Sequence, residues 1–230
     1  MKKKLVALLM AFVSCFSLGA TAFAAENPEQ TFKDVSPDDW YYEGVEYVND
    51  LGIMTGLGDE NEGYFKPDEY LQRQDLALIL ARFYKKYINS ELNLDESKEA
   101  YYEDAVTWVK KYNVMTGYGS GDFGIGNAII RQDMVVALFR YQNTVYNFAY
   151  DTIVPDLDNI CDFPDNNEVD GYAVQALYRY ILNGIIQGEG TDFKILNPHG
   201  KVTRGMAAVI LQRFMERYKD YLLNGFKDLL

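Results

Sequence analysis

One stretch of the sequence occurs three times in the same order, and this repetition limits the possible folds more than any other feature. Each copy begins with a glycine-marked turn, continues through a short irregular loop, and ends at an arginine that opens an apolar-periodic helix. The copies cover residues 52–75, 114–133 and 184–204. Because they recur at a period of roughly sixty residues, the chain is predicted to be an array of one module. Function is then expected at a feature that every module repeats.

Each module is predicted to be a helix, a loop and a second helix, because its apolar residues recur at the spacing of one helix face. No module would bury that face alone, so the three are expected to pack as one all-α, pseudo-threefold helical domain. The predicted modules span 27–88, 96–147 and 160–223, after a signal peptide at 1–24. The predicted helices cover 41–51, 71–88, 101–112, 131–145, 172–182 and 204–223.

Local signals predict details of the first module. Ser36 or Asp38 is expected to cap the first helix, and Gly52 is expected to end it. Pro67 predicts an extended backbone at Lys66, because a proline disfavours the helical region for the residue before it.

The first residues predict export. Lysines at 2–4 precede an apolar run at 5–16, and 22–24 supplies the small residues at which a signal peptidase cleaves. Lipidation at Cys15, which follows a weak lipobox, is the alternative to this cleavage. Cys161 is the only other cysteine, so no intrachain disulfide is expected in the mature chain. No later run approaches the roughly 18 apolar residues of a membrane span, so no transmembrane span is expected.

The charge of the chain limits its partners. The formal net charge is −12, and loss of the signal-peptide lysines makes it more negative. Nucleic-acid binding is not expected, because it requires a basic face and no Lys/Arg cluster with interleaved aromatic residues occurs. The long-range field repels an anionic polymer, so such a partner requires local, partly desolvated cationic pockets. Three isolated arginines fit that requirement: Arg73, Arg131 and Arg204.

Several motifs occur together and in order. A Phe-x-Asp-Val sequence at 32–35 precedes Trp40, Gly-Ile-x-x-Gly turns follow the first helices, and an arginine opens each second helix. A Phe-x-Pro sequence at 65–67 closes the first loop. Together these motifs resemble the S-layer homology family, whose modules usually occur in threes in exported proteins of bacteria with a thick or S-layered wall. The resemblance covers nearly all of the mature chain.

The resemblance implies a location, a partner and a set of site residues. Members of the family anchor proteins noncovalently to a secondary cell-wall polysaccharide, which often carries pyruvate ketals, so the cell wall or S-layer is the expected location. A ketal carboxylate suits a guanidinium, a turn glycine lets the sugar approach the main chain, and an aromatic ring packs on the sugar. The implied ligand-binding residues are Arg73, Arg131, Arg204, Gly56, Gly117, Gly188, Trp40, Tyr101 and Tyr172.

The copies depart from the family pattern in different ways. Gln72 and Ile130 replace the threonine that usually caps the second helix, so only Thr203 is expected to act as a side-chain cap. The second module lacks a clear Phe-x-Asp opening and a Phe-x-Pro loop. In the third module, Gly205-Met206 replaces the acidic end of the motif. The three grooves are therefore not expected to bind equally.

Structural roles are the alternative for each nominated residue type. An arginine could pair with a carboxylate of a neighbouring module and only hold the modules together. The aromatic residues could belong to the core or only form a groove wall, and the glycines could serve turn geometry alone. No metal is expected at an acidic run that lacks the EF-hand pattern. That run consists of Asp156, Asp158, Asp162, Asp165 and Asp170, and His199 nearby is expected to be a solvated loop residue.

No catalytic motif is present, so the chain is predicted to be a nonenzymatic binding protein without a cofactor. It has no Gly-x-Ser-x-Gly, His-Glu-x-x-His or P-loop sequence and no Cys/His pair. One alternative is a scaffold that binds a surface-layer protein through exposed Tyr and Phe patches. Another is a secreted glycan hydrolase that uses a carboxylate pair.

Overall fold

The computed structural model describes residues 30–57, 62–119, 121–146, 163–190, 192 and 194–224. The predicted signal peptide at 1–24, Cys15 with its alternative lipidation, and Cys161 lie outside these ranges. Over the described residues the regular structure is helical, and extended segments form only isolated bridges, which confirms the all-α prediction. None of the described helices is both long and apolar enough to cross a membrane. The elements are α1 (Tyr42–Asp50), α2 (Arg73–Tyr87), α3 (Glu103–Lys111), α4 (Arg131–Tyr146), η3 (Asn166–Glu168), α5 (Val174–Leu182) and α6 (Arg204–Asn224).

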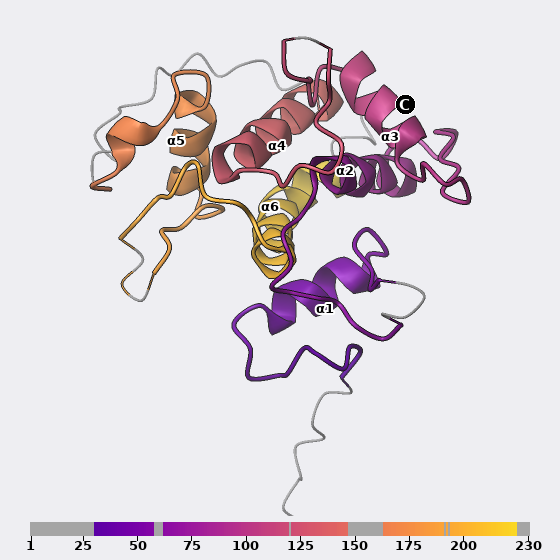
Figure 1. Cartoon of the computed structure of the whole chain (residues 1–230), viewed down its shortest axis with the longest axis horizontal. Helices are drawn as coiled ribbons and strands as arrows, with labels where there is room; N and C mark the ends of the chain where they lie inside the picture. Colours follow the sequence, from indigo (N-terminus) through magenta and orange to yellow (C-terminus); the bar gives the residue numbers. More distant parts are fainter. Residues whose placement is uncertain are drawn as a thin grey trace, which may run out of the picture.

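The helices pack in pairs that cross the predicted module boundaries. Helix α2 packs on α3, α4 packs on α5, and α6 packs on α1. The last pair joins the third predicted module to the first, so the packing closes into a ring. Figure 1 shows α2, α4 and α6 meeting near the centre, with α1, α3 and α5 arranged around them.

A closed cycle of backbone hydrogen bonds joins the segments that precede the three central helices. The Leu71 amide donates to the Val202 carbonyl (2.9 Å), the Val202 amide to the Ile129 carbonyl (3.0 Å), and the Ile129 amide to the Leu71 carbonyl (2.9 Å). All three residues are buried, so these backbone groups need partners within the protein. The cycle gives the fold a pseudo-threefold centre.

Three buried aromatic residues, one from each central helix, lie close together. Phe83, Tyr141 and Phe214 each lie ten residues after the arginine that begins their helix. The ring centroids of Phe83 and Tyr141 are 6.0 Å apart, and those of Tyr141 and Phe214 are 6.4 Å apart. All three rings are buried. Because aromatic side chains bury large apolar areas, this contact is a major source of the free energy that holds the central helices together.

The aspartate of the Phe-x-Asp motif shapes the first loop. The two carboxylate oxygens of Asp34 accept hydrogen bonds from the amides of Phe65 and Lys66, both at 2.8 Å. The prediction of an extended backbone at Lys66 is wrong, since its φ is +61°. The two carboxylate bonds hold this left-handed turn in place. Asp165 bonds the amide of Asn197 in the same way, and φ there is +51°.

The predicted helix caps have different outcomes. Helix α1 begins at Tyr42 and has no side-chain cap, so the prediction of a cap from Ser36 or Asp38 is wrong. The Ser36 amide instead bonds the Asp39 carboxylate at 2.7 Å, which closes a turn before the helix begins. The predicted cap at Thr203 is confirmed, because its Oγ1 accepts a hydrogen bond of 3.2 Å from an amide in the first turn of α6.

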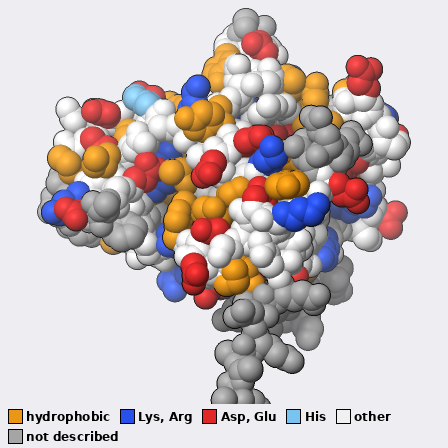
Figure 2. Space-filling model, turned by 60° about the horizontal axis from the view of Figure 1, so that its bottom comes forward, with side chains coloured by type: hydrophobic (Ala, Val, Ile, Leu, Met, Phe, Trp, Pro, Cys, Tyr) orange, Lys and Arg blue, Asp and Glu red, His pale blue; other side chains and the backbone are white. Residues whose placement is uncertain are grey.

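The surface carries charges of both signs. Figure 2 shows acidic and basic side chains interspersed over one face, with hydrophobic side chains exposed between them. Three of the exposed aromatic residues are ones that the sequence nominated. Trp40 is 66% exposed, Tyr172 54% and Tyr101 36%, so the alternative in which these rings belong to the core is excluded.

Candidate functional site

The nine nominated residues form three groups around the ring, and each group draws on all three predicted modules. An arginine comes from one module, a glycine from the next, and an aromatic residue from the third. We define groove 1 as Arg204, Gly56 and Tyr101; groove 2 as Arg73, Gly117 and Tyr172; and groove 3 as Arg131, Gly188 and Trp40.

The three grooves differ in how they open. Groove 2 encloses about 300 Å³ beside α4, and groove 3 encloses about 500 Å³ beside α6, each lined by its three nominated residues. These volumes lie within the usual range for small-molecule sites, about 300–1,000 Å³. At groove 1 the hollow of about 580 Å³ lies further along α2, beside Thr55 and Arg82. Arg204, Gly56 and Tyr101 do not line it.

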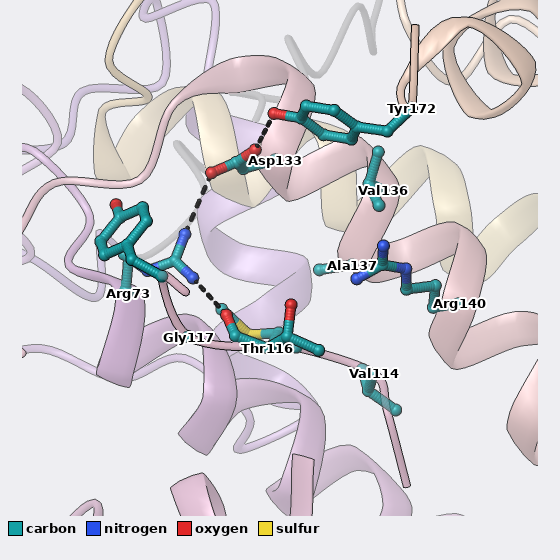
Figure 3. A pocket seen from close by; sticks show the side chains of 11 residues that line it. Arg73, Val114, Thr116, Gly117, Asp133, Val136, Ala137, Arg140 and Tyr172 are labelled. Atoms are coloured by element: carbon teal, nitrogen blue, oxygen red, sulfur yellow. Dashed lines mark hydrogen bonds and ion pairs between the residues drawn. The ribbon is translucent and has the colours of Figure 1, made fainter. Parts of the chain in front are cut away.

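Arg73 shows how a helix-opening arginine is held (Figure 3). Its Nε donates to the Phe123 carbonyl at 3.0 Å and its Nη2 to the Thr116 carbonyl at 2.9 Å, while Nη1 pairs with the Asp133 carboxylate at 3.0 Å. The guanidinium carbon lies 4.9 Å from the ring centroid of Tyr118. All these partners belong to the second predicted module, so Arg73 joins the first module to the second.

The other two helix-opening arginines occupy equivalent places. Arg204 donates through Nε and Nη2 to two carbonyls of the first predicted module, both at 2.8 Å. Arg131 donates through Nη2 to the Gln187 carbonyl at 2.5 Å and pairs with Glu189 at 3.1 Å. Its Nε is buried and has no hydrogen-bond partner among the described residues. Among the described residues, Arg131 and Arg204 thus each bond or pair through two guanidinium nitrogens, whereas Arg73 uses all three.

All three of these arginines are buried. Arg73 and Arg131 are 5% exposed and Arg204 is 7% exposed. Burial lowers the pKa of Arg131 and of Arg204, while Glu189 and Asp75, respectively, oppose this by favouring the charged form. Each arginine thus bonds residues of a neighbouring predicted module, and Arg73 and Arg131 also pair with a carboxylate there. Their binding of a ligand stays a prediction.

The turn glycines lie where the backbone of the same module crosses closely. A Cβ built on Gly117 would lie 2.3 Å from the Asp122 carbonyl oxygen, and one on Gly56 would lie 2.7 Å from the Phe32 ring. Neither glycine has a positive φ, so the close approach rather than the turn conformation requires glycine there. Gly188 lines the hollow of groove 3.

The exposed aromatic rings differ in their polar contacts. The hydroxyl of Tyr172 donates to Asp133, and that of Tyr101 donates to Asp75, both at 2.6 Å. Burial and these carboxylates raise the pKa of both tyrosines. In groove 3 the corresponding acid is absent, because Met206 stands two residues after the arginine. Groove 3 is accordingly the more apolar of the two hollows that contain nominated residues.

A second set of arginines lines the hollows, and sequence reasoning missed it. Arg82, Arg140 and Arg213 each lie nine residues after the helix-opening arginine of their helix. Each lines the hollow beside its own helix. The spacing of nine residues between the two arginines, constant in three copies, could have identified this set from the sequence.

The acidic run near the third predicted module has structural bonds where it is described. Asp165 holds a loop, as noted above, and Asp170 accepts a hydrogen bond of 2.6 Å from the Gln132 side chain. The side chain of His199 is 52% exposed and lies 3.3 Å from Asp170, in keeping with a solvated loop position. Over the described residues no group of three or more His, Cys, Asp or Glu side chains is placed to hold a metal ion. Asp156, Asp158 and Asp162 lie outside the described ranges.

Comparison with known proteins gives a family for part of the chain. Two segments, 31–77 and 95–135, match the S-layer homology domain. The chain is similar to the Surface-layer 125 kDa protein of Lysinibacillus sphaericus, at 24% identity over 179 residues, which is 76% of this chain and 14% of that protein. It is also similar to the S-layer protein sap of Bacillus anthracis, at 27% identity over 94 residues, which is 40% of this chain and 11% of that protein.

An enzyme is also among the relatives. An endoglucanase of Bacillus sp. (strain KSM-635) is 25% identical over 139 residues, which is 56% of this chain and 14% of the enzyme. The chain thus spans only a small part of each relative. The matches support an S-layer homology domain protein that associates in general with the cell surface or a surface layer.

Proposed function

We propose that this protein anchors itself noncovalently at the cell surface by binding an anionic secondary cell-wall polysaccharide in grooves between its modules. The two segments that match the S-layer homology domain support surface attachment. The observation that carries the polysaccharide proposal is the repeated combination of an exposed aromatic ring, a turn glycine and arginine side chains around a hollow of sugar-binding size.

We also propose that 160–223 is a third copy of the module, with the other two at 27–88 and 96–147. This segment lies outside the matched residues. Its support is geometric, because Val202 takes the third place in the backbone cycle with Leu71 and Ile129. Arg204 likewise makes the two carbonyl bonds that Arg73 makes.

The chemistry of a groove suits a sugar that bears a carboxylate, such as a pyruvate ketal. An exposed ring such as Trp40 packs against the apolar face of a sugar. A glycine such as Gly188 lets the sugar approach the main chain. A guanidinium binds a carboxylate through two parallel hydrogen bonds, and it does so more strongly where water is excluded. Local recognition of this kind is required because the net charge of the chain is negative.

Export through the leader at 1–24 and a nonenzymatic role complete the proposal. The endoglucanase does not favour a hydrolase here, since only 14% of that enzyme aligns. Exposed rings such as Trp40 and Tyr172 also suit a protein partner, so a scaffold for a surface-layer protein is the second candidate.

Cosedimentation of the mature chain with purified cell walls tests the proposal. We expect the chain to pellet with intact walls and to stay in the supernatant once the secondary polymer has been extracted. Equal pelleting with extracted walls would contradict polysaccharide anchoring. Pelleting restored by adding a surface-layer protein to extracted walls would favour the scaffold, and release of reducing sugar would favour the hydrolase.

A further inference from the structure

The second arginine of each central helix has different partners in the three copies. Arg82 on α2, Arg140 on α4 and Arg213 on α6 occupy equivalent sequence positions, and each lines a hollow beside its own helix. Each helix-opening arginine bonds or pairs with carbonyls or carboxylates of the protein through at least two of its three guanidinium nitrogens. The partners of the second set therefore decide which grooves offer a free guanidinium.

Arg140 faces the hollow of groove 2 without a partner among the described residues. Figure 3 shows it across the pocket from Arg73, which dashed lines join to Asp133 and Thr116, whereas none reaches Arg140. The carboxylate of this pocket is already engaged, because Asp133 accepts from Arg73 Nη1 at 3.0 Å and from the Tyr172 hydroxyl at 2.6 Å. Within the described part of the chain, the side chains that line groove 2 thus retain one positive charge without a counter-ion.

Arg213 holds the same place in groove 3, and no described side chain bonds or pairs with it. Glu189, the acid in this hollow, pairs with Arg131 at 3.1 Å. The positive charge of Arg213 also lowers the pKa of Arg131, which shows that the two cations repel each other. Burial lowers the pKa of Arg213 itself. An anion bound in groove 3 would offset both the repulsion between Arg131 and Arg213 and the cost of burying the charge of Arg213.

Arg82 differs because the chain supplies its counter-ion. Its Nε donates to Glu96 Oε1 at 3.0 Å, and its Nη2 donates to Oε2 of the same carboxylate. Glu96 comes from the segment between α2 and α3 and itself lines the hollow. Lys85 also lines this hollow, but an ammonium lacks the planar fork that pairs with a carboxylate through two bonds.

We propose that Arg140 and Arg213 bind the carboxylate of an acidic sugar residue, and that Glu96 occupies the equivalent place at Arg82 and closes groove 1 to this ligand. The inference rests on the proposed function and assigns the ligand contact to the second arginine of each helix. The helix-opening arginines then position the loops that form the groove walls.

Competition by Glu96 is intramolecular. A tethered carboxylate acts at an effective concentration of roughly millimolar, so a ligand that binds a single groove weakly cannot displace it. The pair is partly exposed, with side-chain exposures of 24% for Arg82 and 35% for Glu96. Replacing Glu96 should therefore free Arg82 without disturbing the core.

Equilibrium dialysis of the mature chain with a methyl hexosaminide that carries a 4,6-pyruvate ketal tests this. The unaltered chain should bind two molecules. Arg140→Ala and Arg213→Ala should each lose one site, with affinity there falling about tenfold or more, as for a lost charge-assisted hydrogen bond. The double variant should bind none, and Glu96→Ala should gain a third site. Arg82→Ala is the matched control, because it removes an arginine that is already neutralised and should still bind two.

The possible failures are distinguishable. If the unaltered chain binds neither the ketal hexosaminide nor the wall polymer, the proposed function fails and the inference falls with it. If it binds and the double variant binds equally well, the function stands and the assignment to Arg140 and Arg213 is overturned. A site count of two in Glu96→Ala would overturn the closure of groove 1. Should an alanine variant lose helix content by circular dichroism, Arg140→Lys and Arg213→Lys keep the charge without the fork, and unchanged affinity in them would overturn the assignment.

Discussion

At the scale of single residues, the helix-opening arginines hold distant segments of the chain together. Arg204 is held by the carbonyls of Phe65 and Thr55, which lie 139 and 149 residues earlier in the chain. Such bonds close the ring of modules, because they connect its last part to its first. A buried guanidinium with these partners is costly to remove, since the two carbonyls are left without a donor.

The change Arg204→Ala should lower the free energy of unfolding by about 2–5 kcal/mol, because two buried acceptors lose a charged donor. Urea unfolding followed by tryptophan fluorescence measures this. Arg217→Ala is the control, since Arg217 lies at the surface and its one hydrogen bond among the described residues is to the Asn183 side chain. Equal effects of the two substitutions would contradict the bridging role.

Two glycines of the second loop should respond differently to alanine. In Gly117→Ala the new Cβ would meet the Asp122 carbonyl oxygen at 2.3 Å, so the loop must shift, and we expect a loss of about 1–3 kcal/mol. Gly119→Ala would meet nothing within 4 Å and should be neutral or slightly stabilising. Thermal unfolding of both variants checks this. An unchanged melting temperature in Gly117→Ala would show that the backbone at Asp122 does not require a glycine at this position.

At the scale of elements, the six helices follow from the period of the apolar residues, and their observed bounds lie close to the predicted ones. The backbone cycle could not be predicted from the period of the apolar residues. Leu71, Ile129 and Val202 each contribute a single bonded position, which is too short for any periodic pattern. Lys66 was mispredicted because the tertiary bonds from Asp34 override the local effect of proline.

The nominated site residues could be placed in modules from the sequence but not assigned to a groove. Each groove combines residues of all three predicted modules, and a repeat shows which residues are equivalent without showing which of them meet. Arg140 and Arg213 were missed because an arginine inside an amphipathic helix resembles an ordinary solvated residue. Only the packing shows that these side chains line a hollow.

The cap of α6 is a separate test at this scale. Thr203→Ala should lower the free energy of unfolding by about 1 kcal/mol, because an amide of the first turn loses its acceptor. Gln72 precedes α2 at the same position and makes no capping bond, so Gln72→Ala should cost clearly less. Urea unfolding of the pair measures the difference, and equal losses would show that the cap contributes nothing.

At the scale of the whole molecule, the main helix pairs of the described residues each join two different predicted modules. Helix α1 packs on α6 and Leu71 bonds Val202, so the first predicted module packs on the third. The chain should therefore unfold as one unit, with stability that comes from neighbouring modules.

Removal of residues 163–230 should abolish cooperative folding of what remains, because α1 loses α6 and α4 loses α5. The mature chain should show a single urea transition by circular dichroism and by fluorescence, and the shortened chain should show none. A cooperative transition in the shortened chain would mean that the first two modules fold alone.

The central claim is that grooves between modules recognise the anionic groups of a wall polymer. The most direct measurement is cosedimentation with walls whose polymer has lost its pyruvate ketals but has kept its sugar chain. The chain is expected to pellet with untreated walls and to remain in the supernatant with ketal-free walls, since the guanidinium groups then have no carboxylate to bind. Equal pelleting with both kinds of wall would contradict recognition through charge.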